Sequence, residues 1–325
     1  MIFTTSAILQ LVFSITTVVL VIIAGWKALD IYRRWDSEDQ EERYNLEKGA
    51  YLTSTAVIIA LGIRVFMVPL YFWTMQGFIS SIPGAMCLWG VFNAIPTLAW
   101  TDLFIKIALP VIYIGWLIVA YLNSKAGTNS AMKGLMGFFL LASPLVLLDS
   151  GLDIGIMLGI TPVEVSCCSN AIDVGTRPLP AAIGDISGQT ILFIAFIVAS
   201  LAYAFILSKV NKNRKMLALS MILSVILVVG FIITTTEVLA PWLLDLPFHH
   251  CPFCLLFLHP LSIIFTVLYW IGLSAPWLIA IVSTFRGYEL MGELGRALNM
   301  KMSQLASVAV LASIFMIIVD MVATL

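Results

Sequence analysis

Apolar residues occur along this chain in long runs that are separated by short polar connections. A helix needs roughly 20 apolar residues to cross the hydrocarbon core of a bilayer. Eight runs are close to this length, and they predict spans at residues 5–26, 50–75, 103–123, 134–160, 189–208, 216–240, 255–284 and 304–324. The fold class we expect is all-α: a polytopic membrane helical bundle of about eight transmembrane helices, forming one integral membrane domain over residues 1–325.

A further apolar stretch, residues 77–102, has a different pattern. Pro83, Gly84, Gly90 and Pro96 interrupt it. These residues break the internal hydrogen bonding that lipid demands of a spanning helix. We therefore expect a re-entrant or interfacial segment at the outer face of the membrane, and no ninth span.

Composition supports a membrane location and narrows the possible partners. Hydrophobic residues make up 61% of the chain and charged residues only 11%, with a formal net charge of −1. This balance predicts the lipid bilayer as the main partner and excludes a strongly basic nucleic-acid binder. The sequence contains no phosphate-binding glycine loop, nucleophile elbow or zincin motif.

Basic residues alternate between the predicted connections. The first, third, fifth and seventh connections hold 14 of the 17: Lys27, Arg33, Arg34, Arg43, Lys48, Lys125, Lys133, Lys209, Lys212, Arg214, Lys215, Arg286, Arg296 and Lys301. Because Lys and Arg are enriched on the cytoplasmic side, both termini are predicted to be non-cytoplasmic. Residues 27–49 are then a charged cytoplasmic loop, formed as a helix or hairpin.

All five cysteines fall on the opposite, outer side in this topology. Cys87 lies in the interrupted segment, Cys167 and Cys168 lie in an outer loop at residues 161–188, and Cys251 and Cys254 open the seventh span. In an oxidising compartment such thiols form disulfides unless a metal or a redox partner holds them. We expect an integral protein of a bacterial inner membrane with its cysteines on the periplasmic side.

The stretch "FHHCPFCLLFLHP" is the strongest chemical motif. A Cys-x-x-Cys pair at a helix start favours thiolates, because the helix N-terminus stabilises negative charge. His249 and His250 add imidazoles, so that His249, His250, Cys251 and Cys254 are candidate ligands for Zn²⁺ or copper. His259 is expected to point elsewhere. A redox-active dithiol, a metal site and a structural disulfide all remain open.

The adjacent pair Cys167–Cys168 is predicted to lie close to Cys251–Cys254, with at least one sulfur contact between the two pairs. This layout resembles that of membrane thiol oxidases, in which a loop cysteine pair passes electrons to a Cys-x-x-Cys pair and on to quinone. The resemblance is limited to these few residues. Those enzymes have a four-helix core, whereas eight spans are predicted here. Vicinal and Cys-x-x-Cys cysteines are also similar to those of small mercury-uptake proteins.

Ionisable residues inside the predicted spans form a second set of candidates. Arg64 and Asp149 lie at matching depths, so we expect them to face the bundle interior and to pair. Asp153 lies one turn further out, and Lys106 and Glu237 lie near the outer ends of their spans. Five further carboxylates are expected in the outer loops, on the same side of the membrane: Asp102, Glu164, Asp173, Asp185 and Asp245. Charges in a membrane are costly, which favours either a structural pair or a proton or cation route.

Three hypotheses for function follow from these patterns. The first is thiol–disulfide or electron transfer through Cys251, Cys254, Cys167 and Cys168, linked to a membrane quinone, a periplasmic redox protein or the subunits of a respiratory complex. The second is binding or transport of a soft metal ion such as Cu, Zn or Hg. The third is a structural membrane subunit whose outer loops are joined by disulfides.

Overall fold

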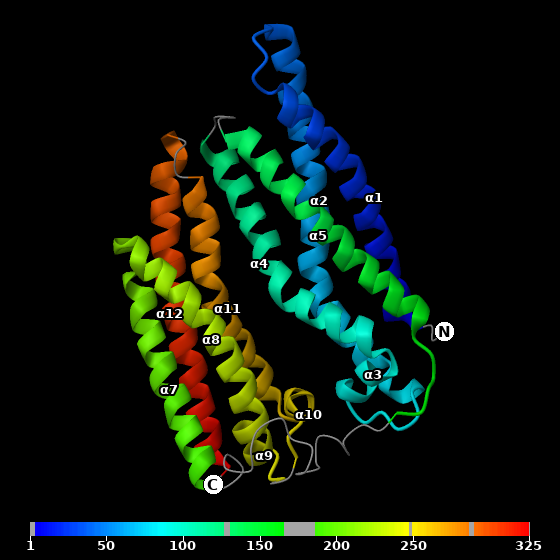
Figure 1. Ribbon diagram of the computed structural model, residues 1–325, viewed down its shortest axis with the longest axis vertical. Helices are drawn as coiled ribbons and strands as arrows, with labels where there is room; N and C mark the ends of the chain where they lie inside the picture. Colours follow the sequence, from blue (N-terminus) through cyan, green and yellow to red (C-terminus); the bar gives the residue numbers. More distant parts are fainter. Residues whose placement is uncertain (1–3, 127–130, 166–185, 247–248, 286–288, 325) are drawn as a thin grey trace. The chain divides into compact units, whose positions relative to one another are not determined.

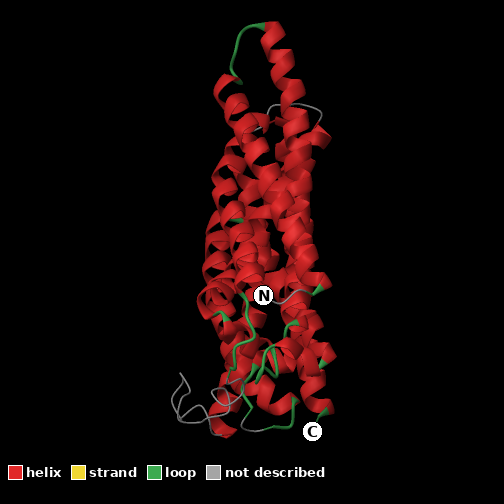
Figure 2. Cartoon of the chain, turned by 90° about the vertical axis from the view of Figure 1, so that its right-hand side faces the viewer, coloured by secondary structure: helices red, strands yellow, loops and turns green. Residues whose placement is uncertain are grey.

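The computed structural model describes residues 4–126, 131–165, 186–246, 249–285 and 289–324, and every element in these ranges is a helix (Figures 1 and 2). Eight helices are long and apolar enough to cross a membrane. They are α1 (Thr5–Arg34), α2 (Gln40–Gly77), α4 (Pro96–Ala126), α5 (Met132–Gly159), α7 (Ile186–Lys209), α8 (Arg214–Thr234), α11 (Pro260–Thr284) and α12 (Glu289–Ala323). The predicted number of spans is confirmed, and these helices indicate an integral, multi-pass membrane protein in a lipid bilayer.

The helices extend beyond the apolar runs that predict them. α1 continues to Arg34 and α2 starts at Gln40, so most of the charged loop predicted at residues 27–49 is helical. Asp39 caps α2 by accepting a hydrogen bond from the backbone N–H of Glu41 at 3.1 Å. Carboxylates are favourable at a helix N-terminus, which explains why α2 starts within the charged segment.

The interrupted segment at residues 77–102 forms short pieces and contributes no ninth span. After α2 come η1 (Ile79–Ser81) and α3 (Leu88–Ala94), and α4 then begins at Pro96. Gly84 has a φ of +82°, and a Cβ atom at this position would lie 2.1 Å from the carbonyl oxygen of Val165. Only glycine fits this turn.

The seventh predicted span is two helices. α10 (Pro252–Leu258) ends at His259, which has an extended backbone with φ −119° and ψ 96°. α11 then starts at Pro260, a residue that has no N–H and suits the first turn of a helix. The Cys-x-x-Cys pair therefore lies at the start of α10, outside the spanning helix.

The chain divides into two compact units. Unit 1 comprises Met1–Pro83, Val91–Glu164 and Ile281–Gly295. Within it, α1 packs on α2 and α5, and α4 packs on α2 and α5 (Figure 1). The N-terminal half of the face that α1 turns inward is largely polar, with Gln10, Ser14 and Thr17 buried, whereas Ile15 and Ile22 are exposed. Such an inverted pattern suits a lipid-facing surface around a polar interior.

Unit 2 comprises Gly84–Gly90, Val165–Ala280 and Arg296–Leu325. α7 leads through η5 (Val210–Lys212) to α8, which continues as the π-helical turn η6 (Thr235–Leu239) and α9 (Ala240–Leu243). Phe196, Phe231 and Tyr269 join α7, α8 and α11 in one core, and the Phe231 and Tyr269 rings stack with centroids 4.8 Å apart. The hydroxyls of Ser303 and Ser313 on α12 donate to backbone carbonyls of α7 and α11.

Candidate metal centre and buried ion network

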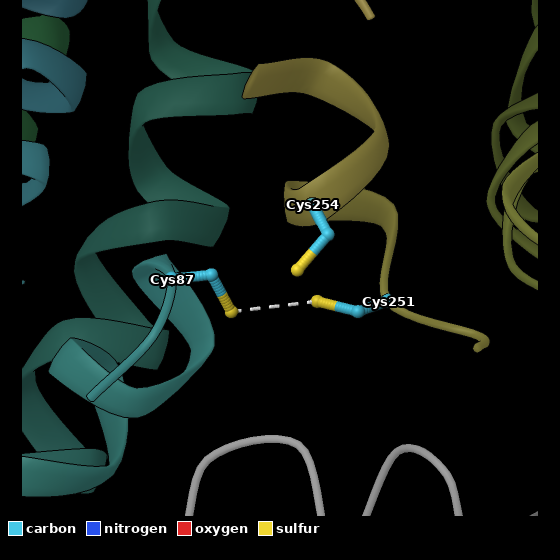
Figure 3. Close-up of side chains that lie close together, drawn as sticks. All are labelled: Cys87, Cys251 and Cys254. Atoms are coloured by element: carbon cyan, nitrogen blue, oxygen red, sulfur yellow. Dashed lines mark hydrogen bonds between the residues drawn. The ribbon is translucent and has the colours of Figure 1, made fainter. Parts of the chain in front are cut away.

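Three cysteine sulfurs meet in unit 2 (Figure 3). Cys87 lies directly before α3, Cys251 is the N-cap of α10, and Cys254 lies in the first turn of α10. Their Sγ atoms all lie within 4.8 Å of one another, and those of Cys87 and Cys251 are 3.6 Å apart. Two segments far apart in the sequence thus supply a single three-sulfur cluster.

Local structure explains how α10 presents two of these sulfurs. Cys251 has an extended backbone, and Pro252 then occupies the first helical position, where its fixed φ favours helix initiation. Positions i and i+3 lie on the same side of a helix start, so Cys251 and Cys254 point the same way. Phe253 lies against Trp89 of α3, with ring centroids 6.5 Å apart, and this contact holds the two cysteine segments together.

Burial and hydrogen bonds between the thiols determine the pKa values in the cysteine cluster. Cys87, Cys251 and Cys254 are 4%, 0% and 8% exposed. The hydrogen bond with Cys254 lowers the pKa of Cys251, but the hydrogen bond with Cys87 and burial outweigh it and raise this pKa to about 12. Hydrogen bonds with Cys251 and Cys87, together with burial, also raise the pKa of Cys254. This is opposite to the lowered pKa expected from a helix N-terminus, because α10 is only two turns long and its first turn is buried.

The spacing of the sulfurs suits a single metal ion. A metal–thiolate bond of about 2.3 Å places sulfurs roughly 3.8–4.0 Å apart in a tetrahedral or trigonal site. The cluster therefore needs only small side-chain adjustments to coordinate one ion.

The histidines of the motif have other contacts. His250 is buried, and its Nδ1 atom lies 3.0 Å from the carbonyl oxygen of Thr236 and 3.6 Å from Oε2 of Glu237. His259 Nδ1 lies 3.3 Å from Oδ2 of Asp320 on α12. Neither His249 nor His250 is in the three-sulfur group found among the described residues. Among the described residues, the third group beside Cys251 and Cys254 is the Cys87 sulfur.

Cys167 and Cys168 lie outside the described residues. Their contact with Cys251 and Cys254 therefore stays a prediction.

Unit 1 contains a second cluster, made of buried charges. Arg64 of α2 donates to Oδ2 of Asp149 at 2.8 Å and to Oδ2 of Asp153 at 2.7 Å. Lys106 of α4 donates to Oδ1 of Asp149 at 2.6 Å and lies 3.0 Å from Oδ1 of Asp153. The matching depths of Arg64 and Asp149 correctly predict that these two residues pair in the interior.

Sequence reasoning missed several members of this ion network. Asp102 was expected in an outer loop, but α4 begins at Pro96, so Asp102 is helical and buried, and its Oδ1 atom accepts from Lys106 at 3.1 Å. The i, i+4 spacing of Asp102 and Lys106 was the signal that could have shown this. Three neutral donors complete the network: Gln10 and Ser14 to Asp153, and Tyr113 to Asp149.

Comparison with known proteins adds no assignment. No protein-family model matches the chain, and neither the curated proteins nor the solved structures give a significant match.

The two clusters are suited to different chemistry. Three thiols at one point can coordinate a soft ion or exchange a disulfide. A buried network of carboxylates with Arg and Lys can hold helices together or carry a proton.

Proposed function

We propose that this membrane protein binds one soft metal ion through the thiolates of Cys87, Cys251 and Cys254. A single observation carries the proposal: three buried sulfurs from two distant segments lie within 4.8 Å of one another. Sulfur ligands select soft ions over the hard, oxygen-binding ions such as Mg²⁺ and Ca²⁺.

Copper(I) is the ion that this ligand set favours. Structural Zn²⁺ sites are almost always four-coordinate, whereas the cluster among the described residues offers three sulfurs. Cu(I) prefers soft thiolate ligands. Burial also keeps water away from the ion, which limits oxidation of the thiolates.

The orientation of the centre follows from charge. We assign the basic helix ends to the cytoplasm by the positive-inside rule, which places both termini and the cysteines outside it. In a bacterial inner membrane the centre would then face the periplasm. There it would capture a soft ion for storage, transfer or transport by the membrane protein.

Thiol–disulfide exchange is the second candidate, and the 3.6 Å contact between the Cys87 and Cys251 sulfurs favours it. In this reaction the Cys87 thiolate attacks Cys251 of a Cys251–Cys254 disulfide, a Cys87–Cys251 bond forms, and Cys254 leaves as a thiolate. Net oxidation of the dithiol would require a quinone or a protein disulfide as electron acceptor. Burial of all three sulfurs hinders access by a protein partner.

Metal titration tests the proposal. The reduced, purified protein is titrated with Cu(I), and bound copper is measured by elemental analysis and by the ultraviolet thiolate-to-copper absorption. We expect one tightly bound Cu(I) per chain and loss of this binding in Cys87→Ser. The double variant Cys167→Ser/Cys168→Ser is the control, because it keeps the three-sulfur cluster.

The same preparation distinguishes the two candidates. Copper binding that is unchanged in Cys87→Ser would contradict the metal centre. If the isolated protein instead carries a disulfide among the three cysteines, and quinone oxidises the reduced form with stoichiometric loss of two thiols, thiol–disulfide exchange is the function.

A further inference from the structure

The buried ion network of unit 1 has an imbalance of charge. It contains two cations, Arg64 and Lys106, and three carboxyl groups, Asp102, Asp149 and Asp153, and each of the five residues is at most 3% exposed. If all five were ionised, the network would carry one excess negative charge within the membrane-spanning helices. An uncompensated charge in that environment is expensive, and a buried group avoids it by binding a proton.

The hydrogen bonds show where the excess charge would lie. Asp149 and Asp153 each accept three hydrogen bonds, and both contact Arg64 and Lys106. Asp102 accepts only one from the described part of the chain, from Lys106 to its Oδ1 atom. Its Oδ2 atom is buried and has no hydrogen-bond partner among the described residues. A buried, ionised carboxylate oxygen without a hydrogen-bond partner is destabilised by the full free-energy cost of its removal from water.

We propose that Asp102 is a proton-binding site: its carboxyl group holds one proton, and it is the group through which unit 1 takes up and releases protons. With Asp102 protonated, the two cations balance the two carboxylates of α5. Release of the proton, from carboxylic acid to carboxylate plus H⁺, changes the charge of the network by −1. A function in proton binding is thus added to the metal centre of unit 2.

The surroundings of Asp102 favour a proton over a metal ion. A hard cation such as Ca²⁺ takes six to eight oxygen ligands, whereas Asp102 offers one unpartnered oxygen and the Lys106 ammonium lies 3.1 Å from the other. Lys106 is the charged group that contacts Asp102, and the other charged and titratable groups of the network and beside it are Tyr113 on α4, Arg64 and Tyr71 on α2, and Asp149 and Asp153 on α5. Asp102 is the only one of the three network carboxyl groups without an Arg64 contact.

Asp102 lies near one end of α4. It lies six residues after Pro96, which corresponds to about 9 Å along the helix from its first residue. A proton that exchanges with Asp102 therefore has only a short distance to cross to this end of the membrane-spanning helix.

Infrared difference spectroscopy tests for the proton directly. A protonated carboxyl group has a C=O stretching band that ionised carboxylates lack, and we expect such a band at neutral pH in the intact protein and its loss in Asp102→Asn. Transfer to D₂O should shift the band if the proton exchanges. A spectrum without the band, or a band that is retained in Asp102→Asn, overturns the assignment. A band that does not shift after prolonged exposure to D₂O overturns the role in proton exchange.

Matched substitutions provide a test that is independent of the spectrum. Asn resembles a neutral carboxyl group in shape and charge, so Asp102→Asn should melt close to the parent protein. Asp149→Asn and Asp153→Asn remove a charge that pairs with both cations, and should melt at clearly lower temperatures. If Asp102→Asn instead lowers the melting temperature as much as the other two, Asp102 is an ionised structural partner and the proposal fails.

Discussion

At the scale of single residues, Asp149 has the most closely surrounded side chain of the ion network. It accepts from Arg64, Lys106 and Tyr113 at distances between 2.6 and 2.8 Å. We expect Asp149→Asn to lower the free energy of unfolding by roughly 3–5 kcal/mol, because it removes the carboxylate that pairs with both buried cations. Thermal melting of the detergent-solubilised protein checks this.

The matched control for Asp149→Asn is Asp36→Asn. Asp36 also pairs with a lysine, Lys133, but its side chain is 73% exposed. Exposed pairs contribute about 1 kcal/mol or less, so this variant should melt like the parent. Equal melting temperatures for both variants would show that the network contributes little to stability.

A second prediction at this scale concerns the hydroxyl of Tyr113. It donates to Oδ2 of Asp149 at 2.8 Å, and the ring is buried. Tyr113→Phe keeps the ring and removes a hydrogen bond to a charged group, so we expect a loss of about 1.5–3 kcal/mol in unfolding free energy. Tyr44→Phe, at an exposed position of α2, should have no measurable effect. A Tyr113→Phe variant as stable as Tyr44→Phe would contradict the contact.

Side-chain pairing was predictable only where depth in the membrane determined it. Arg64 and Asp149 could be paired because each can be counted from the end of an apolar run. Asp102 could not be placed, since the apolar run of α4 starts after it, while the helix starts before it. The role of Cys87 was likewise hidden, because its neighbours Cys251 and Cys254 lie more than 160 positions away in sequence and no local pattern links them.

At the scale of helices, close packing of α11 on α12 depends on Gly272. A Cβ atom at this position would lie 2.2 Å from Cγ2 of Val310 and 3.3 Å from the carbonyl oxygen of Ala306. We expect Gly272→Ala to destabilise the protein by about 1–3 kcal/mol, since Val310 is a stiff β-branched residue that fits closely against the glycine. The melting temperature of the purified variant measures this.

Gly230→Ala on α8 is the control for Gly272→Ala. A Cβ atom there meets nothing within 4 Å, and alanine is the better helix former by about 0.5–1 kcal/mol. Gly230→Ala should therefore leave stability unchanged or slightly raised. If Gly272→Ala and Gly230→Ala have the same melting temperature, Val310 of α12 does not lie against Gly272 of α11.

Apolar runs predicted the existence of the spanning helices more reliably than their ends. The run from Leu255 to Leu258 joins the next span without a polar residue other than His259, so the break between α10 and α11 is hidden in the pattern. Pro260 was the available signal. Conversely, α1 continues to Arg34, beyond the apolar run. Polar residues also form helices outside the lipid, so hydropathy does not predict where such a helix ends.

At the scale of the whole molecule, each unit combines a lipid-exposed surface with buried polar groups. Exposed apolar side chains occur on α1 and α2 in unit 1 and on α7 and α8 in unit 2. In unit 1 the buried charges form the ion network, and in unit 2 the cysteine cluster lies in the same unit as the His250–Glu237 and His259–Asp320 contacts. This division of the chain could not be predicted from the sequence, because the runs are similar in length and hydropathy throughout.

The orientation of the whole molecule gives the last prediction. Glu38 lies in the connection between α1 and α2, and Thr161 lies just after α5. Both residues are exposed, and the predicted topology puts them on opposite sides of the membrane. With the basic connections in the cytoplasm, a membrane-impermeant thiol reagent added to intact cells should label Thr161→Cys and leave Glu38→Cys unlabelled. Inverted membrane vesicles should give the reverse.

Both substitutions are made in a Cys167→Ser/Cys168→Ser background to remove other outer thiols, and the buried Cys87, Cys251 and Cys254 should react slowly from either side. Labelling of Glu38→Cys in intact cells would reverse the orientation and move the cysteine centre to the cytoplasmic face, where the thiols would remain reduced without a metal.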